Sequence, residues 1–167
     1  LLGVYDAHRI GGLRFKVEGK EQFQNEDKGF AAPPWTSLRE LEHASIELEK
    51  DILNDREAIK WLNMLIAPGA SLGGARPKAS VLDDSNHPWI AKFPSVNDDH
   101  NIGAWEMLAN ELAQKAGISV TKGMIRKFNS VHDTYLSKRF DRTSKNSRIH
   151  YASVMTLLCH IDEDLPA

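Results

Sequence analysis

The chain has 167 residues, enough for one domain or two small ones, and its hydrophobic (41%) and charged (26%) fractions are those of an ordinary soluble protein. Its formal net charge of −2 provides no overall positive field, so we expect no direct binding to nucleic acid. The single cysteine, Cys159, excludes an intrachain disulfide and favours the cytoplasm, and no stretch approaches the roughly 20 apolar residues that span a membrane.

Residues 1–17 predict a strand, a turn and a second strand, because apolar and polar residues alternate strictly from Leu13 to Val17. His8 falls in the turn and is expected at the surface. Residues 16–29 are polar and contain two glycines, which predicts a loop, and Pro33-Pro34 predicts an extended linker.

Two helices are expected next. Ser37 and Glu40 have the spacing of a capping box, and an apolar stripe at helical spacing runs from Leu38 to Leu48, so we expect the glutamates of the other face to be solvated. A second helix is predicted from Asp55 to Ile66, where Pro68-Gly69 would end it.

A Gly-rich loop and a hairpin follow, in the stretch PGASLGGARPKASVLDDSNHPWIAK. Because Gly73 and Gly74 lack a Cβ, the backbone there can bend tightly and present N–H groups to an anion. Strands are predicted at 79–82 and 89–93, joined by a turn at 83–86. Strand periodicity places Ile90 and Lys92 on one face, opposite Trp89, Ala91 and Phe93.

The loop is not a Walker A motif, because Ala75 stands where the lysine belongs and the loop leads into a strand. A Gly-rich hairpin with a lysine on the next strand is the order found in protein-kinase-like folds, although the kinase G-x-G-x-x-G is also absent. From the residues alone, a surface hairpin with Lys92 as a solubilising lysine of an edge strand is an equally good interpretation.

A helix is predicted from about Asn101 to Ala116, ended by Gly117 in a left-handed turn. Glu106 lies about 100° around the helix from Trp105, at the edge of the apolar stripe, so its carboxylate can reach the strand on which the helix packs. Glu111 is the competing carboxylate, and both are also explained as surface acids. The expected stripe consists of Ile102, Trp105, Leu108, Ala109 and Leu112.

Residues 121–128 and 134–140 predict an antiparallel strand pair joined near Asn129-Ser130. The second strand ends in KRFDR, where Asp141 and Arg142 have the simple interpretation of a strand-end ion pair. A basic loop follows, and then a mostly apolar helix over 149–161. His150 and His160 are ten residues apart without a partner at ligand spacing, which excludes a metal site built on them.

Five segments in order resemble the HipA family of bacterial serine/threonine kinases, which act as toxins in toxin–antitoxin modules: SLGGARPKAS, WIAKFPS, GAWEMLANELAQKAGI, YLSKRFDR and RIHYASVMTLL. GVYDAHRIGGLRF and PWTSLRELEHASIELE are similar to that family as well. The resemblance implies an α+β fold, with a protein-kinase-like N-lobe of antiparallel sheet plus helix, preceding helices and the first helix of a helical C-lobe. Residues 1–18 would end a β-rich N-terminal subdomain, 19–35 form a loop or linker, 36–140 form the N-lobe, and 141–167 form the hinge and the start of the C-lobe.

The resemblance also implies an ATP site. Lys92 would contact the α- and β-phosphates, and Glu106 would pair with Lys92 and hold it extended. Ser71 matches the serine that is autophosphorylated in the family; a phosphate there adds roughly −1.5 to −2 charge where the ATP phosphates belong, which predicts ejection of the loop and inactivation. The residues expected to bind ATP are Ser71, Leu72, Gly73, Gly74, Ala75, Lys78, Lys92, Arg139, Phe140 and Asp141, with Arg139 and Phe140 in the hinge and Asp141 near the ribose.

A protein kinase also needs one aspartate to orient the acceptor hydroxyl, and a second aspartate with an asparagine to hold Mg²⁺. The resemblance places these catalytic and metal-binding residues downstream of Ala167, so we expect the chain by itself not to turn over ATP. A protein substrate and a small DNA-binding antitoxin are the partners that the family implies. The alternative is a catalytically incomplete nucleotide-binding or regulatory interaction module.

Overall fold

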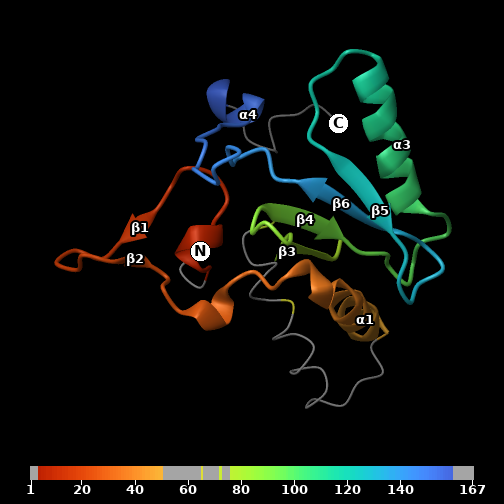
Figure 1. Ribbon diagram of the computed structural model, residues 1–167, viewed down its shortest axis with the longest axis horizontal. Coiled ribbons are helices and arrows are strands. Elements are labelled where there is room, and N and C mark those ends of the chain that lie inside the picture. Colours follow the sequence, from red (N-terminus) through yellow and green to blue (C-terminus); the bar gives the residue numbers. More distant parts are fainter. Residues whose placement is uncertain (1–3, 51–64, 66–71, 73–75, 160–167) are drawn as a thin grey trace.

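The computed structural model describes residues 4–50, 65, 72 and 76–159. It is a mixed fold in which a four-stranded antiparallel sheet lies between helix α1 (Leu38–Glu49) on one side and helix α3 (Ile102–Lys115) on the other (Figure 1). A small hairpin, β1 (Phe15–Lys16) and β2 (Phe23–Gln24), extends away from this sheet. Among the described helices, none combines the length and the apolar character needed to cross a membrane.

The main sheet has the order β3–β4–β6–β5, and every neighbouring pair is antiparallel. Its strands are β3 (Lys78–Leu82), β4 (Pro88–Lys92), β5 (Gly123–Arg126) and β6 (Thr134–Lys138). Both predicted strand pairs are therefore confirmed. Asn86 in the first turn has φ 59°, a conformation that asparagine tolerates better than most residues. In the register, Lys92 stands opposite Lys78 on one side and Tyr135 on the other, so these three side chains share a face.

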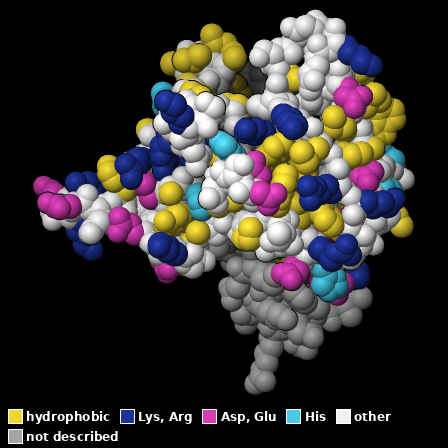
Figure 2. All heavy atoms as spheres, in the orientation of Figure 1, with side chains coloured by type: hydrophobic (Ala, Val, Ile, Leu, Met, Phe, Trp, Pro, Cys, Tyr) yellow, Lys and Arg dark blue, Asp and Glu magenta, His cyan; other side chains and the backbone are white. Residues whose placement is uncertain are grey.

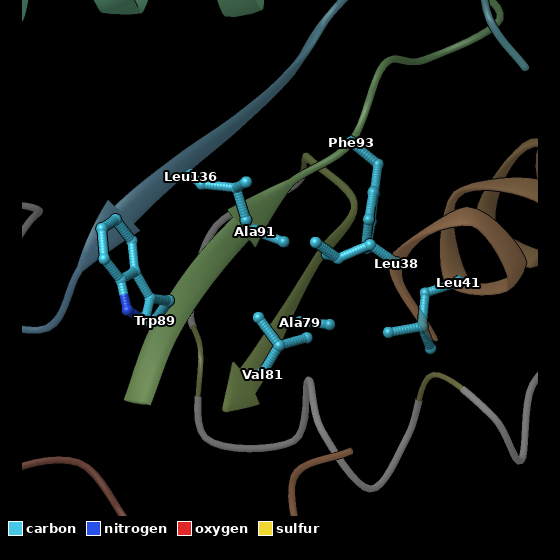
Figure 3. Packing of buried hydrophobic residues seen from close by; sticks show 8 residues of the cluster. All are labelled: Leu38, Leu41, Ala79, Val81, Trp89, Ala91, Phe93 and Leu136. Atoms are coloured by element: carbon cyan, nitrogen blue, oxygen red, sulfur yellow. The ribbon is translucent and has the colours of Figure 1, made fainter. Parts of the chain in front are cut away.

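The core lies between the opposite face of the sheet and α1 (Figure 3). Leu38 and Leu41 of α1 point toward the apolar side chains that the predicted alternation assigned to this face. All of the cluster residues are nearly inaccessible to solvent, which explains why β-branched, aromatic and small residues alternate here with polar ones. The cluster consists of Leu38, Leu41, Ala79, Val81, Trp89, Ala91, Phe93 and Leu136.

Helix α1 corrects two predictions. A 3₁₀ turn precedes it, Ser37 is itself helical (φ −82°, ψ 0°), and its side chain caps nothing, so the predicted capping box is wrong. Glu42 is fully buried rather than solvated. Its carboxylate accepts hydrogen bonds from the amides of Asn129 (2.9 Å) and Ser130 (3.0 Å) and from the hydroxyl of Thr134 (2.5 Å). It thereby ties α1 to the β5–β6 connection.

Helix α3 has the predicted bounds and ends: the Asn101 side chain accepts from the amide of Ala104, and Gly117 has φ +77°. However, the predicted apolar stripe does not face the sheet. Trp105 is 60% exposed, and Leu108 and Leu112 are exposed as well. Figure 2 shows hydrophobic side chains gathered over α3. The helix packs through Gly103, Glu106, Met107 and Asn110 instead.

A Cβ on Gly103 would lie 2.1 Å from the carbonyl oxygen of Asp133 and would clash with it. Only glycine allows this close approach of helix to strand, so the glycine face turns inward and the larger apolar side chains turn outward. The position of one small residue therefore decides the rotation of the helix about its axis.

The two ends of the described chain also differ from the predictions. A 3₁₀ helix occupies Asp6–His8, within the predicted turn, and β1 lies within the strand predicted from Leu13 to Val17, whereas β2 lies where residues 16–29 predicted a loop. Residues 149–153 are not helical, and α4 covers only Val154–Leu157, capped by Ser153. The helix predicted over 55–66 falls, except for residue 65, outside the described residues.

Candidate functional site

A cavity of about 310 Å³ lies on the face of the sheet that is turned away from the α1 core; we call it the central pocket. It brings together five residues that the resemblance placed at an ATP site: Lys92, Glu106, Arg139, Phe140 and Asp141. Its other lining residues are Ile10, Ile90, Tyr135, Ser137, Lys138 and Tyr151.

Lys92 and Glu106 form an ion pair inside this pocket. Lys92 ends strand β4, Glu106 lies in the second turn of α3, and the Lys92 Nζ is 2.5 Å from the Glu106 Oε2. The close approach of Gly103 to β6 brings the Glu106 carboxylate over the sheet, next to Lys92 of β4. The two side chains remain 35% and 26% exposed, so the ammonium keeps a side from which a ligand can reach it.

Tyr135 supports the pair from the neighbouring strand. Its ring centroid is 5.7 Å from the Lys92 Nζ, within the range of a cation–π contact. Burial, and then the nearby charge of Glu106, raises the pKa of the Tyr135 hydroxyl. The tyrosine is therefore neutral at physiological pH, and the charges on this part of the pocket floor are those of Lys92 and Glu106.

Most of the Gly-rich loop lies outside the described residues, namely Ser71 and the segment 73–75; Leu72 is half-buried. Its exit is held by a residue that the sequence analysis missed. Both terminal nitrogens of Arg76 donate to Asp98, at 2.9 and 2.5 Å, and Asp98 also accepts from the amide of Ser95. Burial by itself raises the pKa of Asp98, but the hydrogen bonds from Arg76 and Ser95 outweigh it and hold that pKa below its usual value. This pair joins the start of β3 to the loop after β4.

Lys78, where β3 begins, shares the face of the sheet that carries Lys92, because the two residues are partners in the register. Its side chain therefore leaves the strand on the side of the sheet on which the central pocket lies, outside the residues that line the pocket. Figure 2 shows basic and acidic side chains interspersed over the visible surface of the molecule.

The segment after β6 forms a buried ionic group, which we call the hinge cluster: Arg139, Asp141 and Arg142. Their side chains are at most 3% exposed. Asp141 accepts from Arg139 at 2.6 and 2.8 Å and from Arg142 at 2.5 Å. Burial alone raises the pKa of Asp141, but hydrogen bonds from Arg139 and from the backbone outweigh it, so the pKa is lowered and the carboxylate stays charged.

The hinge cluster also holds the N-terminal segment. The Gly11 amide donates to Asp141 at 2.7 Å, and Arg139 donates to the carbonyl oxygens of His8 (2.6 Å) and Arg9 (3.0 Å). Both oxygens of Asp141 are thus engaged by the protein. The ribose contact implied for Asp141 stays a prediction. The strand-end ion pair with Arg142 is present, and the contacts of Asp141 with Arg139 and Gly11 are the ones that the sequence analysis missed.

His8 is half-buried here rather than in an exposed turn, which corrects the expectation from the sequence. Its Nδ1 accepts a hydrogen bond from the amide of Ala32 at 2.7 Å. Burial, together with the positive charges of Arg139, Arg142 and Arg148, lowers its pKa to about 4. The ring is therefore neutral at neutral pH and bridges two N-terminal segments.

A family model described as the HipA-like C-terminal domain matches residues 70–165, which is more than half of the chain and includes the whole four-stranded sheet, α3 and the hinge cluster. No curated protein matches the chain, and no solved structure does. The matched range contains both residues of the Lys92–Glu106 pair. On this match, the chain belongs to the family of proteins with a HipA-like C-terminal domain.

Proposed function

We propose that the chain binds ATP in the central pocket and forms the ATP-binding portion of a serine/threonine protein kinase of the HipA type, the toxin of a bacterial type II toxin–antitoxin module. The observation that carries this proposal is the Lys92–Glu106 pair on the pocket floor. In the proposal, the four-stranded sheet and α3 are a kinase-like N-lobe, and Arg139 and Phe140 lie at the hinge.

The contribution of this ion pair to stability is small, so the proposal rests on its position in the central pocket. Pairs between groups that are about one-third exposed typically add less than about 1 kcal/mol. A lysine that is held in an extended position by a carboxylate, however, presents a fixed positive charge to a ligand. Phosphate is the ligand group that gains most from such a charge.

Phosphoryl transfer depends mainly on neutralising charge and on holding the reacting groups in line. In the proposed site, Lys92 orients the α- and β-phosphates and Glu106 orients Lys92. Lys78, on the same face, adds a second positive charge, and the amides of residues 71–75 would surround the phosphates. Phosphorylation of Ser71 would add negative charge at the same place and would exclude ATP.

Within the described ranges, no cluster of histidine, cysteine and acidic side chains is arranged to hold a metal ion. We derive no step from a bound metal. The proposal leaves Mg²⁺ and the aspartate that orients the acceptor hydroxyl to residues beyond Ala167. The protein substrate and the small DNA-binding antitoxin are likewise proposed from the family alone.

Isothermal titration of the chain with ATP tests the proposal. The Lys92→Ala variant should bind ATP about 10- to 100-fold more weakly, the effect of losing one charge-assisted contact to phosphate. Lys115→Ala, at the exposed end of α3, is the matched control and should bind like the original chain.

In a protein that carries the complete kinase, Lys92→Ala should also abolish phosphorylation and growth arrest, while Lys115→Ala should not. Absence of ATP binding to the original chain would refute the proposal and favour an interaction module. Equal affinity of the two variants would refute the role of Lys92.

A further inference from the structure

We infer that the N-terminal strap, residues 8–12, forms one wall of the nucleotide site, and that Ile10 contacts the base opposite Phe140 and Tyr151. This inference rests on the proposed function. It adds that a segment distant in the chain from the sheet and outside the residues matched by the family model supplies a residue that determines base affinity.

The strap is held at both sides of Ile10 by backbone contacts. The carbonyl oxygen of Arg9 accepts from Arg139 at 3.0 Å and from Arg142 at 2.8 Å, and the amide of Gly11 donates to Asp141 at 2.7 Å. Since both chain neighbours of Ile10 are bound to the buried hinge cluster, the position of the Ile10 side chain is determined by the hinge itself. The side chain is half-buried and lines the central pocket.

Tyr151 closes the same end of the pocket. Its Cε1 lies 3.3 Å from the place where a Cβ on Gly11 would stand, so the ring rests on the strap at a point that a glycine occupies. Gly11 also has φ +72°, which L-residues with side chains rarely adopt. The Tyr151 ring meets the edge of Phe140 at 4.7 Å between centroids. The strap, the hinge and the segment before α4 thus converge on one apolar corner.

This corner still exposes apolar surface: Phe140 is 57% exposed and Tyr151 is 41% exposed. A planar base placed against the two rings and Ile10 would cover part of that surface, and base–aromatic contacts are favourable for any base.

The charged end of the pocket lies at a suitable distance from the apolar corner. Ile90, which lines the pocket near the hinge, precedes Lys92 by two residues on the same face of β4, which is roughly 7 Å along the strand. One end of the pocket is therefore apolar and the other carries the Lys92 ammonium with its partner Glu106, as expected for a nucleotide with its base at the hinge and its phosphates at Lys92.

Ile10 and Tyr151 also line a second cavity, of about 410 Å³, whose lining includes Leu13 and Thr156. Because both residues line both cavities, the second cavity is a competing location for the base. Leu13 lines only the second cavity and is 65% exposed, which makes it a matched control on the same segment.

The test titrates the full chain and its variants with ATP, adenosine and inorganic tripolyphosphate. Ile10→Ala should weaken ATP and adenosine about 4- to 15-fold, the effect of losing contact with one or two buried methylene groups, and should leave tripolyphosphate within about twofold. Lys92→Ala should weaken ATP and tripolyphosphate but not adenosine. Leu13→Ala should change none of the three affinities. Ile10→Val is the milder substitution for the case that Ile10→Ala does not fold. It should weaken the binding of ATP and adenosine about two- to fourfold.

The remaining outcomes distinguish failure of the inference from failure of the proposed function. If Lys92→Ala weakens ATP but Ile10→Ala and Ile10→Val leave adenosine and ATP within twofold of the original chain, the strap makes no base contact and the inference is wrong, while the proposed function stands. Weakening of adenosine by Leu13→Ala would place the base in the second cavity and overturn the inference as well. Absence of binding by the original chain would overturn both proposals.

Discussion

Replacing Glu42 with alanine should destabilise the protein by about 2–4 kcal/mol. The carboxylate is fully buried and accepts three hydrogen bonds, from the amides of Asn129 and Ser130 and from the hydroxyl of Thr134. Each buried donor left without a partner costs about 1–3 kcal/mol. The two amides are only partly buried, so water can satisfy them in part, whereas the hydroxyl of Thr134 is fully enclosed. The sum is reduced further because alanine removes a carboxylate that is costly to bury.

The assay is urea and thermal denaturation followed by circular dichroism. For a chain of this size, 1 kcal/mol corresponds to about 2–4 °C, so Glu42→Ala should lower the Tm by about 5–15 °C. Glu42→Gln keeps the shape and one acceptor oxygen, and should cost only about 1–2 kcal/mol. Glu40→Gln, exposed on the same helix, should stay within about 0.5 kcal/mol. A loss below about 0.5 kcal/mol for Glu42→Ala would refute the claim that this side chain attaches α1 to the β5–β6 connection.

Three further predictions concern the close approach of α3, the buried histidine and the hinge cluster. Gly103→Ala would raise helix propensity by about 1 kcal/mol, yet it should lower the stability measured in urea, because its Cβ would lie 2.1 Å from the carbonyl oxygen that precedes β6. The control is Ala109→Gly at an exposed position of the same helix, which changes helix propensity in the opposite direction without a clash. A gain in stability for Gly103→Ala would contradict the prediction. Lowering the pH from 6.5 to 4 should destabilise the folded state, because the pKa of His8 is about 6.5 in the unfolded chain and about 4 in the folded chain. The His8→Asn variant, which retains a hydrogen-bond acceptor, should lose less stability over that range. An equal loss would exclude His8 as the cause. Asp141→Asn should lower the free energy of unfolding by about 3–5 kcal/mol, because two buried guanidinium groups lose their carboxylate. The same substitution should accelerate tryptic cleavage within residues 8–12. Cleavage at the original rate would show that the strap is held by other contacts.

The β3–β4 and β5–β6 hairpins of the main sheet could be predicted because their information is local. Period-two alternation from Trp89 to Phe93 needs only neighbouring residues, and the turn residues between the strands mark where each strand ends. The ends of α3 followed from Asn101 and Gly117 in the same way. The contact between Lys92 and Glu106 was anticipated as well, through the family resemblance, and the structure contains it.

The failures share a different cause. Ser37 had the right spacing for a cap, but a 3₁₀ turn placed it inside the helical backbone. Glu42 could have been recognised, because it follows Leu38 by four residues and so lies on the buried face, but a charged residue is assigned to solvent unless its partners are known. His8 and the strap were missed for the same reason, since their partners Arg139 and Asp141 lie more than 100 residues away in the chain.

The amino-acid sequence alone determined the strands of the main sheet, their alternation and the ends of α3, since backbone geometry and neighbouring side chains are sufficient to specify them. Only the tertiary structure decided which face of α3 meets the sheet, where the carboxylates of Glu42 and Asp141 find their donors, and that Ile10 reaches the central pocket. Those features depend on the distance of closest approach between elements and on the pairing of buried charges. Both are properties of atoms that meet only after the chain has folded.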